Sequence, residues 1–151
     1  MKDNDLFAAI KIIFDEKIPF NKVLGLRVHS LEYDEVMLKF SMREELIGNY
    51  MRTSLHGGVI SSVIDVTGGL AAFMGVQKQN SVCDLQKKLD RFSKLGTIDL
   101  RVDYLRPGCG QWFVASGYTL RTGKKVAVTR IELKNDQEDL IAVGTGTYVV
   151  S

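Results

Sequence analysis

The longest hydrophobic segment of the chain, residues 55–74, has the periodicity of a helix. Large apolar residues recur at every third or fourth position and so share one helical face: Val59, Val63, Val66, Leu70 and Met74. Smaller and branched apolar residues fill most of the other faces: Ile60, Ile64, Ala71 and Ala72. A helix that is apolar nearly all round is expected to be enclosed by the rest of the protein.

An amphipathic pattern precedes this segment. Residues 3–17 predict a helix whose apolar stripe consists of Leu6, Phe7, Ile10, Ile13 and Phe14. Pro19 is expected to end that helix, because proline disrupts the preceding turn. Residues 20–22 then predict a short turn that leads to Gly25.

Most of the remaining chain alternates between apolar and polar residues, as half-buried strands do. The predicted strands cover residues 26–31, 36–41, 97–104, 111–121, 125–134 and 140–150. In the strand 97–104, Ile98, Leu100, Val102 and Tyr104 should face one way, and Thr97, Asp99, Arg101 and Asp103 the other. Residues 42–55 read as a loop, and the charged segment 78–95 predicts a short helix over 85–92.

Short turns between the last strands predict antiparallel pairing. The expected architecture is α+β: an antiparallel sheet wrapped around one long central apolar helix, with an extra N-terminal helix. We find no linker or repeat, so residues 1–151 form one domain, with the N-terminal helix in 1–18 and the core in 19–151.

Composition excludes several classes of protein. A chain of 151 residues with 45% hydrophobic composition can bury a core without disulfides or a structural metal. The net charge of +2 is small and its cations are dispersed, so no nucleic-acid partner is expected. Cys83 and Cys109 lack metal-binding spacing and predict reduced thiols in a cytoplasmic protein. The polar N-terminus predicts no signal peptide, and Asp65 argues against membrane insertion of the central helix.

Asp65 is the one carboxylate within the apolar helix. Burying an unpaired carboxylate costs several kcal/mol, so Asp65 must be paired, protonated or functional. A structural pairing with a buried arginine or hydroxyl and a catalytic role both remain open at this point. Two glycines, Gly57 and Gly58, stand at the predicted start of the same helix, where free backbone N–H groups could hold an oxyanion.

Two motifs together carry a resemblance to a known family. The first is Leu55-His56-Gly57-Gly58, with Asp65 nine residues after the histidine. The second is Thr97-x-Asp99-Leu100-x-Val102-x-Tyr104-Leu105-Arg106-Pro107. With these motifs the chain resembles the hotdog-fold acyl-CoA thioesterases, specifically the phenylacetate-pathway (PaaI) type, over roughly residues 20–150. The resemblance implies thioester hydrolysis without metal or prosthetic group, in homodimers that often associate into homotetramers.

The resemblance also implies roles for particular residues. Gly57 would polarise the thioester carbonyl through its N–H, and Asp65 would activate water or attack the thioester directly. Because His56 and Asp65 lie about 13 Å apart along one helix, the resemblance implies that Asp65 of one chain faces Gly57 of another. His56 would orient the loop or contact the thioester oxygen, with a structural cap as the alternative.

Other candidates are less sharply defined. Asn49 resembles the family's upstream asparagine, but its spacing also suits a plain turn residue, and Thr97 could orient the attacking water. Gly58 and four cations at strand ends or turns are candidates for substrate binding, the cations through the phosphates of CoA: Arg106, Arg121, Lys124 and Lys125. The segment 77–94 could form a wall of the acyl pocket, which favours medium or long fatty chains.

Two alternative functions use the same fold. A hydroxyacyl-thioester dehydratase also needs a histidine and a carboxylate, although the His-Gly-Gly motif followed by Asp65 favours hydrolysis. A non-catalytic acyl-CoA-binding protein would need an output module, and the single N-terminal helix is too short to provide one.

Overall fold

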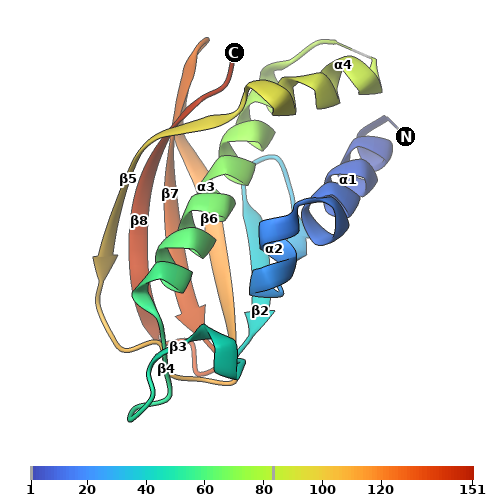
Figure 1. The fold of residues 1–151 in the computed structure, drawn as a ribbon. Coiled ribbons are helices and arrows are strands. Elements are labelled where there is room, and N and C mark those ends of the chain that lie inside the picture. Colours follow the sequence, from blue (N-terminus) through green and yellow to red (C-terminus); the bar gives the residue numbers. More distant parts are fainter. Residues whose placement is uncertain (1, 83) are drawn as a thin grey trace.

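The predicted antiparallel sheet around one long helix is confirmed. The computed structural model describes residues 2–82 and 84–151, so the predicted thiol of Cys83 lies outside the described residues. Within that part of the chain, α3 (Gly57–Gln79) lies against a six-stranded antiparallel sheet of order β1-β2-β6-β7-β8-β5 (Figure 1). The strands are β1 (Arg27–Leu31), β2 (Val36–Ser41), β5 (Gly96–Tyr104), β6 (Trp112–Thr122), β7 (Val126–Asn135) and β8 (Leu140–Val149).

Helix α3 forms the centre of the core. It is long and apolar enough to cross a membrane, but 72% of its most apolar window is buried inside the protein. Ile64 and Leu70 are fully buried between the sheet and the other helices. At Gly144 of β8 a Cβ atom would collide with the Ile64 side chain, so glycine there lets α3 lie directly on the sheet.

The N-terminal segment is more helical than predicted. Helix α1 (Lys2–Ile12) continues into a wider π-helical turn, η1 (Ile13–Lys17), so the predicted amphipathic helix is confirmed. The turn predicted over residues 20–22 is wrong, because α2 (Pro19–Leu24) occupies this position. Pro19 is its first residue, where a missing N–H costs nothing, and Gly25 ends it with a left-handed φ of 68°. Both helices lie beside α3, on the side away from β5 (Figure 1).

Short elements fill the two connecting segments. The predicted loop 42–55 contains a 3-10 turn, η2 (Glu44–Leu46), and a small pair of strands, β3 (Ile47–Asn49) and β4 (Ser54–Leu55). In the charged segment after α3, the predicted short helix is present as α4 (Leu85–Asp90), followed by the 3-10 turn η3 (Arg91–Lys94).

A β-bulge changes which residues of β5 face the core. Thr97 pairs with Tyr148 and Asp99 with Thr147, so Ile98 is an extra residue in β5 and is 58% exposed. The bulge reverses the alternation at this point. The prediction that Thr97 and Leu100 face opposite ways is therefore wrong: Thr97 contacts α3, and Leu100 packs against the same core.

Candidate active site

Asp65 is held by two hydroxyl groups from neighbouring strands. It lies half-buried in the middle of α3. Its Oδ1 atom accepts a hydrogen bond from Thr97 Oγ1 at 2.9 Å and one from Tyr148 Oη at 3.2 Å. Among the described residues, Asp65 forms no ion pair and its Oδ2 atom has no hydrogen-bond partner. The carboxylate is therefore oriented through one oxygen and open at the other.

Tyr148 is the functional residue that sequence reasoning missed. It is 1% exposed, and its hydroxyl also donates to the Asp65 backbone oxygen at 3.0 Å. Burial, followed by the negative charge of Asp65, raises the pKa of this phenol far above its ordinary value, so it acts as a neutral donor. No local sequence signal marks Tyr148, because its position opposite Thr97 follows from the strand register in the structure.

Two glycines make room for the Tyr148 ring. A Cβ at Gly68 of α3 would collide with the phenol oxygen, and one at Gly146 of β8 would lie 2.6 Å from the ring. Side-chain carbons essentially never approach that closely. Glycine at both positions thus permits the ring to reach beneath α3 and contact Asp65.

A pocket of about 170 Å³ opens beside Asp65. Phe14, Ile18 and Asn21 of the N-terminal segment form one side of it, and Phe92 and Leu95 belong to the side that follows α4. Phe92 belongs to the segment 77–94, which is predicted to form a wall of the acyl pocket, and it lines this cavity. Its contact with an acyl chain stays a prediction. A small apolar space that begins at a carboxylate can receive the acyl part of a thioester.

The N-terminus of α3 presents a free amide. His56 is the N-cap residue of this helix, and its Nδ1 atom accepts the Gly58 N–H at 2.8 Å. The Gly58 N–H is therefore occupied, whereas the Gly57 N–H has no partner within residues 2–82 and 84–151. Tyr104 Oη donates to the Gly57 carbonyl oxygen at 3.1 Å and supports the same turn. The N-terminus of α3 therefore provides one backbone hydrogen-bond donor and the positive end of the helix dipole.

The free amide and the carboxylate do not meet within one chain. Gly57 and Asp65 are separated by about 12 Å along α3, at 1.5 Å per residue. Asn49 also lies away from Asp65, in the loop before α3, where its Oδ1 accepts the N–H groups of Met51 at 3.1 Å and Arg52 at 3.3 Å. These contacts are those of a turn asparagine. Of the other predicted catalytic residues, only Thr97 has a side chain that contacts the Asp65 carboxylate in the described chain.

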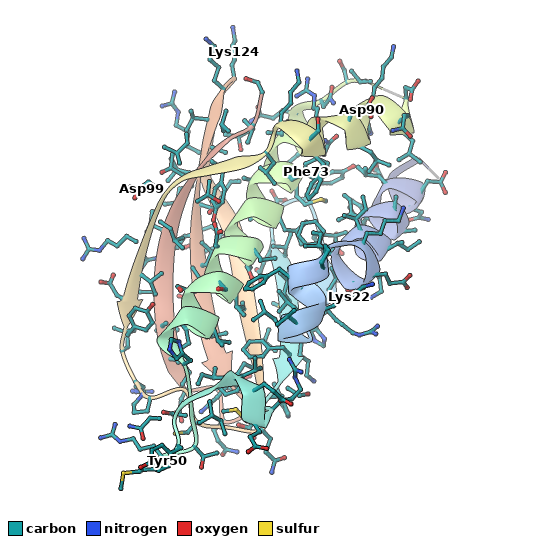
Figure 2. The ribbon with its side chains drawn as sticks, in the orientation of Figure 1. Lys22, Tyr50, Phe73, Asp90, Asp99 and Lys124 are labelled. Carbon is teal, nitrogen blue, oxygen red and sulfur yellow. The ribbon has the colours of Figure 1, made fainter. Side chains whose placement is uncertain are left out.

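The four candidate cations occupy opposite ends of the molecule. Arg106 lines a depression with Gly57 and Arg52, and pairs with Asp139 at 3.5 Å. Arg121, Lys124 and Lys125 lie at the β6–β7 turn, near the C-terminal end of α3, and Figure 2 shows Lys124 far from Tyr50 of the loop before α3. One chain therefore does not gather all four around a single phosphate group. In the described part of the chain, no cluster of His, Cys, Asp and Glu could hold a metal ion.

Comparisons with known proteins agree with this geometry. Residues 53–142 match the family model described as "Thioesterase superfamily". The medium/long-chain acyl-CoA thioesterase YigI of Escherichia coli K12 is 41% identical over 145 residues, which covers 94% of each chain.

Solved structures show the same fold. A Shewanella oneidensis protein, described as related to the thioesterase superfamily, has a TM-score of 0.94 and 43% identity, covering 98% of this chain and 97% of that one. A structure from Syntrophus aciditrophicus has a TM-score of 0.89 and 54% identity, covering 99% and 98%. The predicted hotdog fold and enzyme class are thus confirmed, and the chain belongs to the thioesterase superfamily.

Proposed function

We propose that the protein hydrolyses acyl-CoA thioesters of medium or long chain length to the free acid and CoA. The observation that carries this proposal is that Asp65, oriented by Thr97 and Tyr148, lines a mostly apolar pocket. The name of the relative YigI, a medium/long-chain acyl-CoA thioesterase, supports the substrate class. The PaaI subtype and the cytoplasmic location stay predictions.

In the proposed reaction Asp65 acts as a general base. A water bound to the open Oδ2 atom loses a proton to Asp65 while its oxygen bonds to the thioester carbonyl carbon. The carbonyl oxygen becomes an oxyanion that the Gly57 N–H stabilises. The C–S bond then breaks, and the CoA sulfur leaves with the proton from Asp65. Direct attack by Asp65 through an anhydride is the second route, and it uses the same open oxygen.

This reaction needs two copies of the chain, because one copy keeps its amide and its carboxylate apart. We propose a homodimer in which Gly57 of a second copy faces Asp65, and a dimer of dimers beyond it. Strand β5 is an edge of the sheet and carries the exposed Ile98 and Tyr104, so it offers a place for another copy to pair.

The remaining site residues take supporting roles in this proposal. His56 stabilises the N-terminal turn of α3 by capping it, and Asn49 stabilises the turn in the loop before this helix. Arg106 lies beside Gly57, where the phosphates of CoA could approach the N-terminus of α3. Arg121, Lys124 and Lys125 could reach the same CoA only from another copy of the chain.

The test measures thiol release from decanoyl- and palmitoyl-CoA. Asp65→Asn keeps the size of the side chain and removes the base, so turnover should fall at least about a hundredfold. Asp5→Asn, which changes an exposed carboxylate of α1, is the matched control and should retain wild-type turnover. Near-normal turnover by folded Asp65→Asn would refute the proposal. Formation of an enoyl-CoA from a 3-hydroxyacyl-CoA, without thiol release, would instead indicate the dehydratase.

A further inference from the structure

Two large apolar side chains project from the turn between β3 and β4, which consists of residues 50–53. Tyr50 is 84% exposed and Met51 is 83% exposed, so they are the most exposed large hydrophobic residues of the described chain. Figure 2 shows Tyr50 beyond the N-terminal end of α3, whereas Phe73 lies toward the other end of this helix. Grouped apolar side chains of this kind are typical of a surface that contacts another molecule.

The turn holds these side chains in a defined position. Asn49 Oδ1 accepts the N–H groups of Met51 at 3.1 Å and Arg52 at 3.3 Å. Thr53 has a left-handed φ of 53°, and Cys109 Sγ lies 3.8 Å from the Arg52 carbonyl oxygen. A turn with these internal contacts is ordered before it binds anything, so binding costs little conformational entropy.

The turn is also attached to the N-terminus of α3. Only the two residues of β4 separate it from His56, the cap of this helix. Gly48 of β3 lies so close to His56 that a Cβ atom there would be 2.6 Å from the His56 Cα. Arg52 of the turn and Gly57 of the helix line the same depression. A partner that receives the Gly57 amide therefore also meets the turn.

The proposed dimer determines where the turn lies on the second copy. Each copy places its Gly57 against Asp65 of the other, so the two α3 helices must run antiparallel. A segment that precedes Gly57 in one copy then lies beside residues that follow Asp65 in the other. Gly69 and Leu70 follow Asp65 by about 6 and 8 Å along α3. Three extended residues carry the turn up to about 10 Å beyond Gly57, which reaches the same position.

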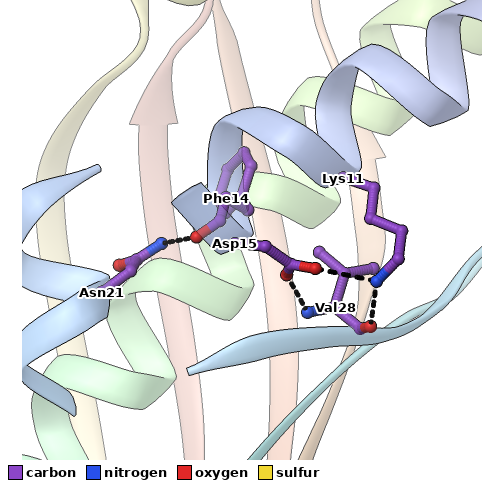
Figure 3. Close-up of polar contacts among 5 residues, drawn as sticks. All are labelled: Lys11, Phe14, Asp15, Asn21 and Val28. Atoms are coloured by element: carbon purple, nitrogen blue, oxygen red, sulfur yellow. Dashed lines mark hydrogen bonds and ion pairs between the residues drawn. The ribbon is translucent and has the colours of Figure 1, made fainter. Parts of the chain in front are cut away.

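Gly69 and Leu70 line the pocket beside Asp65, and one wall of that pocket is fixed within its own copy. Asn21 Nδ2 donates to the Phe14 carbonyl oxygen at 3.1 Å (Figure 3). The π-helical turn η1, which contains Phe14, is tied to β1 through hydrogen bonds of its neighbouring side chains to one backbone position (Figure 3). This wall is held in place, so a longer acyl chain must leave the pocket on another side.

One copy of the chain leaves the pocket too small for the proposed substrates. Its volume of about 170 Å³ holds about six groups of water size, at about 30 Å³ each. A hexanoyl chain fits, whereas a decanoyl or palmitoyl chain extends beyond the pocket. In the dimer, the space beyond the pocket adjoins the turn of the second copy. Apolar carbons there gain free energy only if an apolar surface removes them from water.

We propose that Tyr50 and Met51 of one copy cover the acyl chain bound beside Asp65 of the other copy. This inference rests on the proposed thioesterase function and on its shared site. The first carbons of the chain bind in the pocket of the copy that supplies Asp65, and the distal carbons contact the turn of the copy that supplies Gly57. Tyr50 and Met51 thereby determine the preference for medium or long chains over short ones.

The first experiment compares kcat/KM for decanoyl-CoA and hexanoyl-CoA, following the released thiol. The double variant Tyr50→Ser with Met51→Ser should lower the decanoyl-to-hexanoyl ratio at least about tenfold, the effect of leaving about two methylenes in water. Hexanoyl-CoA is the internal reference, because loss of folded or dimeric protein lowers both values equally. Tyr118→Ser is the matched control and should keep the ratio: Tyr118 is 43% exposed and follows Gly117, which faces α3, so it points away from that helix.

The second experiment shows which copy supplies the turn. One chain carries Gly57→Pro and keeps Asp65, the other carries Asp65→Asn and keeps Gly57, and the two are refolded together so that each mixed dimer has one complete site. The two serine substitutions should lower the decanoyl-to-hexanoyl ratio when they are in the chain that keeps Gly57. They should leave it unchanged when they are in the chain that keeps Asp65.

The outcomes separate this inference from the proposed function. If decanoyl-CoA is hydrolysed but the double variant keeps the wild-type ratio, or if Tyr118→Ser changes it equally, the role of the turn is refuted and the thioesterase stands. An effect from the chain that keeps Asp65 also refutes it, because the turn then acts within its own copy. Mixed dimers without activity refute the shared site and this inference with it. If wild type hydrolyses no acyl-CoA, the proposed function itself fails.

Discussion

Tyr148 and Asp65 are joined by one bifurcated hydrogen bond, in which the single phenol proton is shared between the Asp65 backbone oxygen at 3.0 Å and Oδ1 of the carboxylate at 3.2 Å. The backbone contact fixes the phenol relative to α3, and the side-chain contact fixes the carboxylate relative to the phenol. Because Thr97 donates to the same Oδ1, rotation of the carboxylate would break two bonds. Residues of β5 and β8, in the sheet beneath the carboxylate, thereby determine the orientation of its open Oδ2 atom.

Tyr148→Phe should lower kcat with little change in KM. The variant keeps the buried ring and removes one donor to the carboxylate anion, so we expect kcat to fall about tenfold, a typical effect of one bond to a charged group. Tyr118→Phe, on an exposed tyrosine of β6, is the control. An unchanged kcat would show that Tyr148 is only structural.

Gly57→Pro removes the proposed oxyanion donor with little damage to the fold. Proline suits the first position of a helix, and His56 before it already has the extended backbone that proline requires, with φ −60° and ψ 137°. We expect kcat to fall about 10²- to 10³-fold while the melting temperature is retained. Gly57→Ala keeps the N–H, and its Cβ would meet no side chain closer than 3.5 Å. Equal losses in both variants would contradict the role of the amide.

Mixing two inactive variants tests whether a site is shared between copies. In a two-fold dimer of Asp65→Asn with Gly57→Pro, one of the two sites receives an intact carboxylate and an intact amide. After unfolding and refolding an equal mixture, activity should recover to about a quarter of wild type, because half of the dimers are mixed. Each variant refolded alone is the control. An inactive mixture that still contains mixed dimers would place each complete site within one chain.

His56 should contribute to stability through its cap. His56→Ala leaves the Gly58 N–H without its partner, so urea unfolding should show a loss of about 1 kcal/mol in the free energy of unfolding. Asparagine also caps helices well, and His56→Asn should restore most of that stability. If His56→Asn is stable and its turnover stays within about threefold of wild type, helix capping accounts for the whole role of His56. A large loss of turnover in this stable variant would indicate a direct contact with substrate.

Alkaline pH should destabilise the protein through two phenols whose pKa is raised in the folded state, Tyr148 and Tyr33. Burial and Asp65 raise the pKa of Tyr148, while burial and the hydrogen bond to Asp3 raise the pKa of Tyr33 to about 12. In the unfolded chain both phenols ionise near pH 10. Above that pH the folded state binds more protons than the unfolded state, so the free energy of unfolding falls as the pH rises. Urea unfolding at pH 8 and pH 11 measures this fall.

Tyr148→Phe should show a smaller fall between these two pH values than wild type. Tyr118→Phe, which removes a largely exposed phenol, should behave as wild type. An identical fall in wild type and Tyr148→Phe would mean that the phenol ionises in the folded protein as readily as in the unfolded chain.

The strands of the sheet and the central helix could be anticipated because their hydrophobic periods are long and regular. The same pattern identified Asp65, because a charged residue is an exception in an otherwise apolar helix. Helix α2 was missed because Pro19 can end one helix and begin the next, and the local pattern does not separate these roles. The orientation of Thr97 was missed because a bulge has no periodic signal: one extra residue, Ile98, reverses the alternation.

Tyr148 and Asn21 escaped sequence reasoning for a different reason. Each acts through contacts with residues distant in the chain, Tyr148 with Asp65 and Asn21 with the pocket that Leu95 and Phe92 complete. A tyrosine in a strand and an asparagine two residues after a proline are ordinary choices for local structure. Their importance follows only from tertiary packing, which brings the two ends of the chain to either side of the Asp65 carboxylate.

Phe14, Ile18 and Asn21, which form one wall of the pocket, precede β1 in the chain, whereas the proposed reacting groups belong to α3 and the strands that follow it. Changes in the first two dozen residues can therefore alter which acids the enzyme releases while the hydrolytic apparatus stays intact. In such an arrangement, new substrate ranges can evolve, or be engineered, by exchanging a single terminal segment.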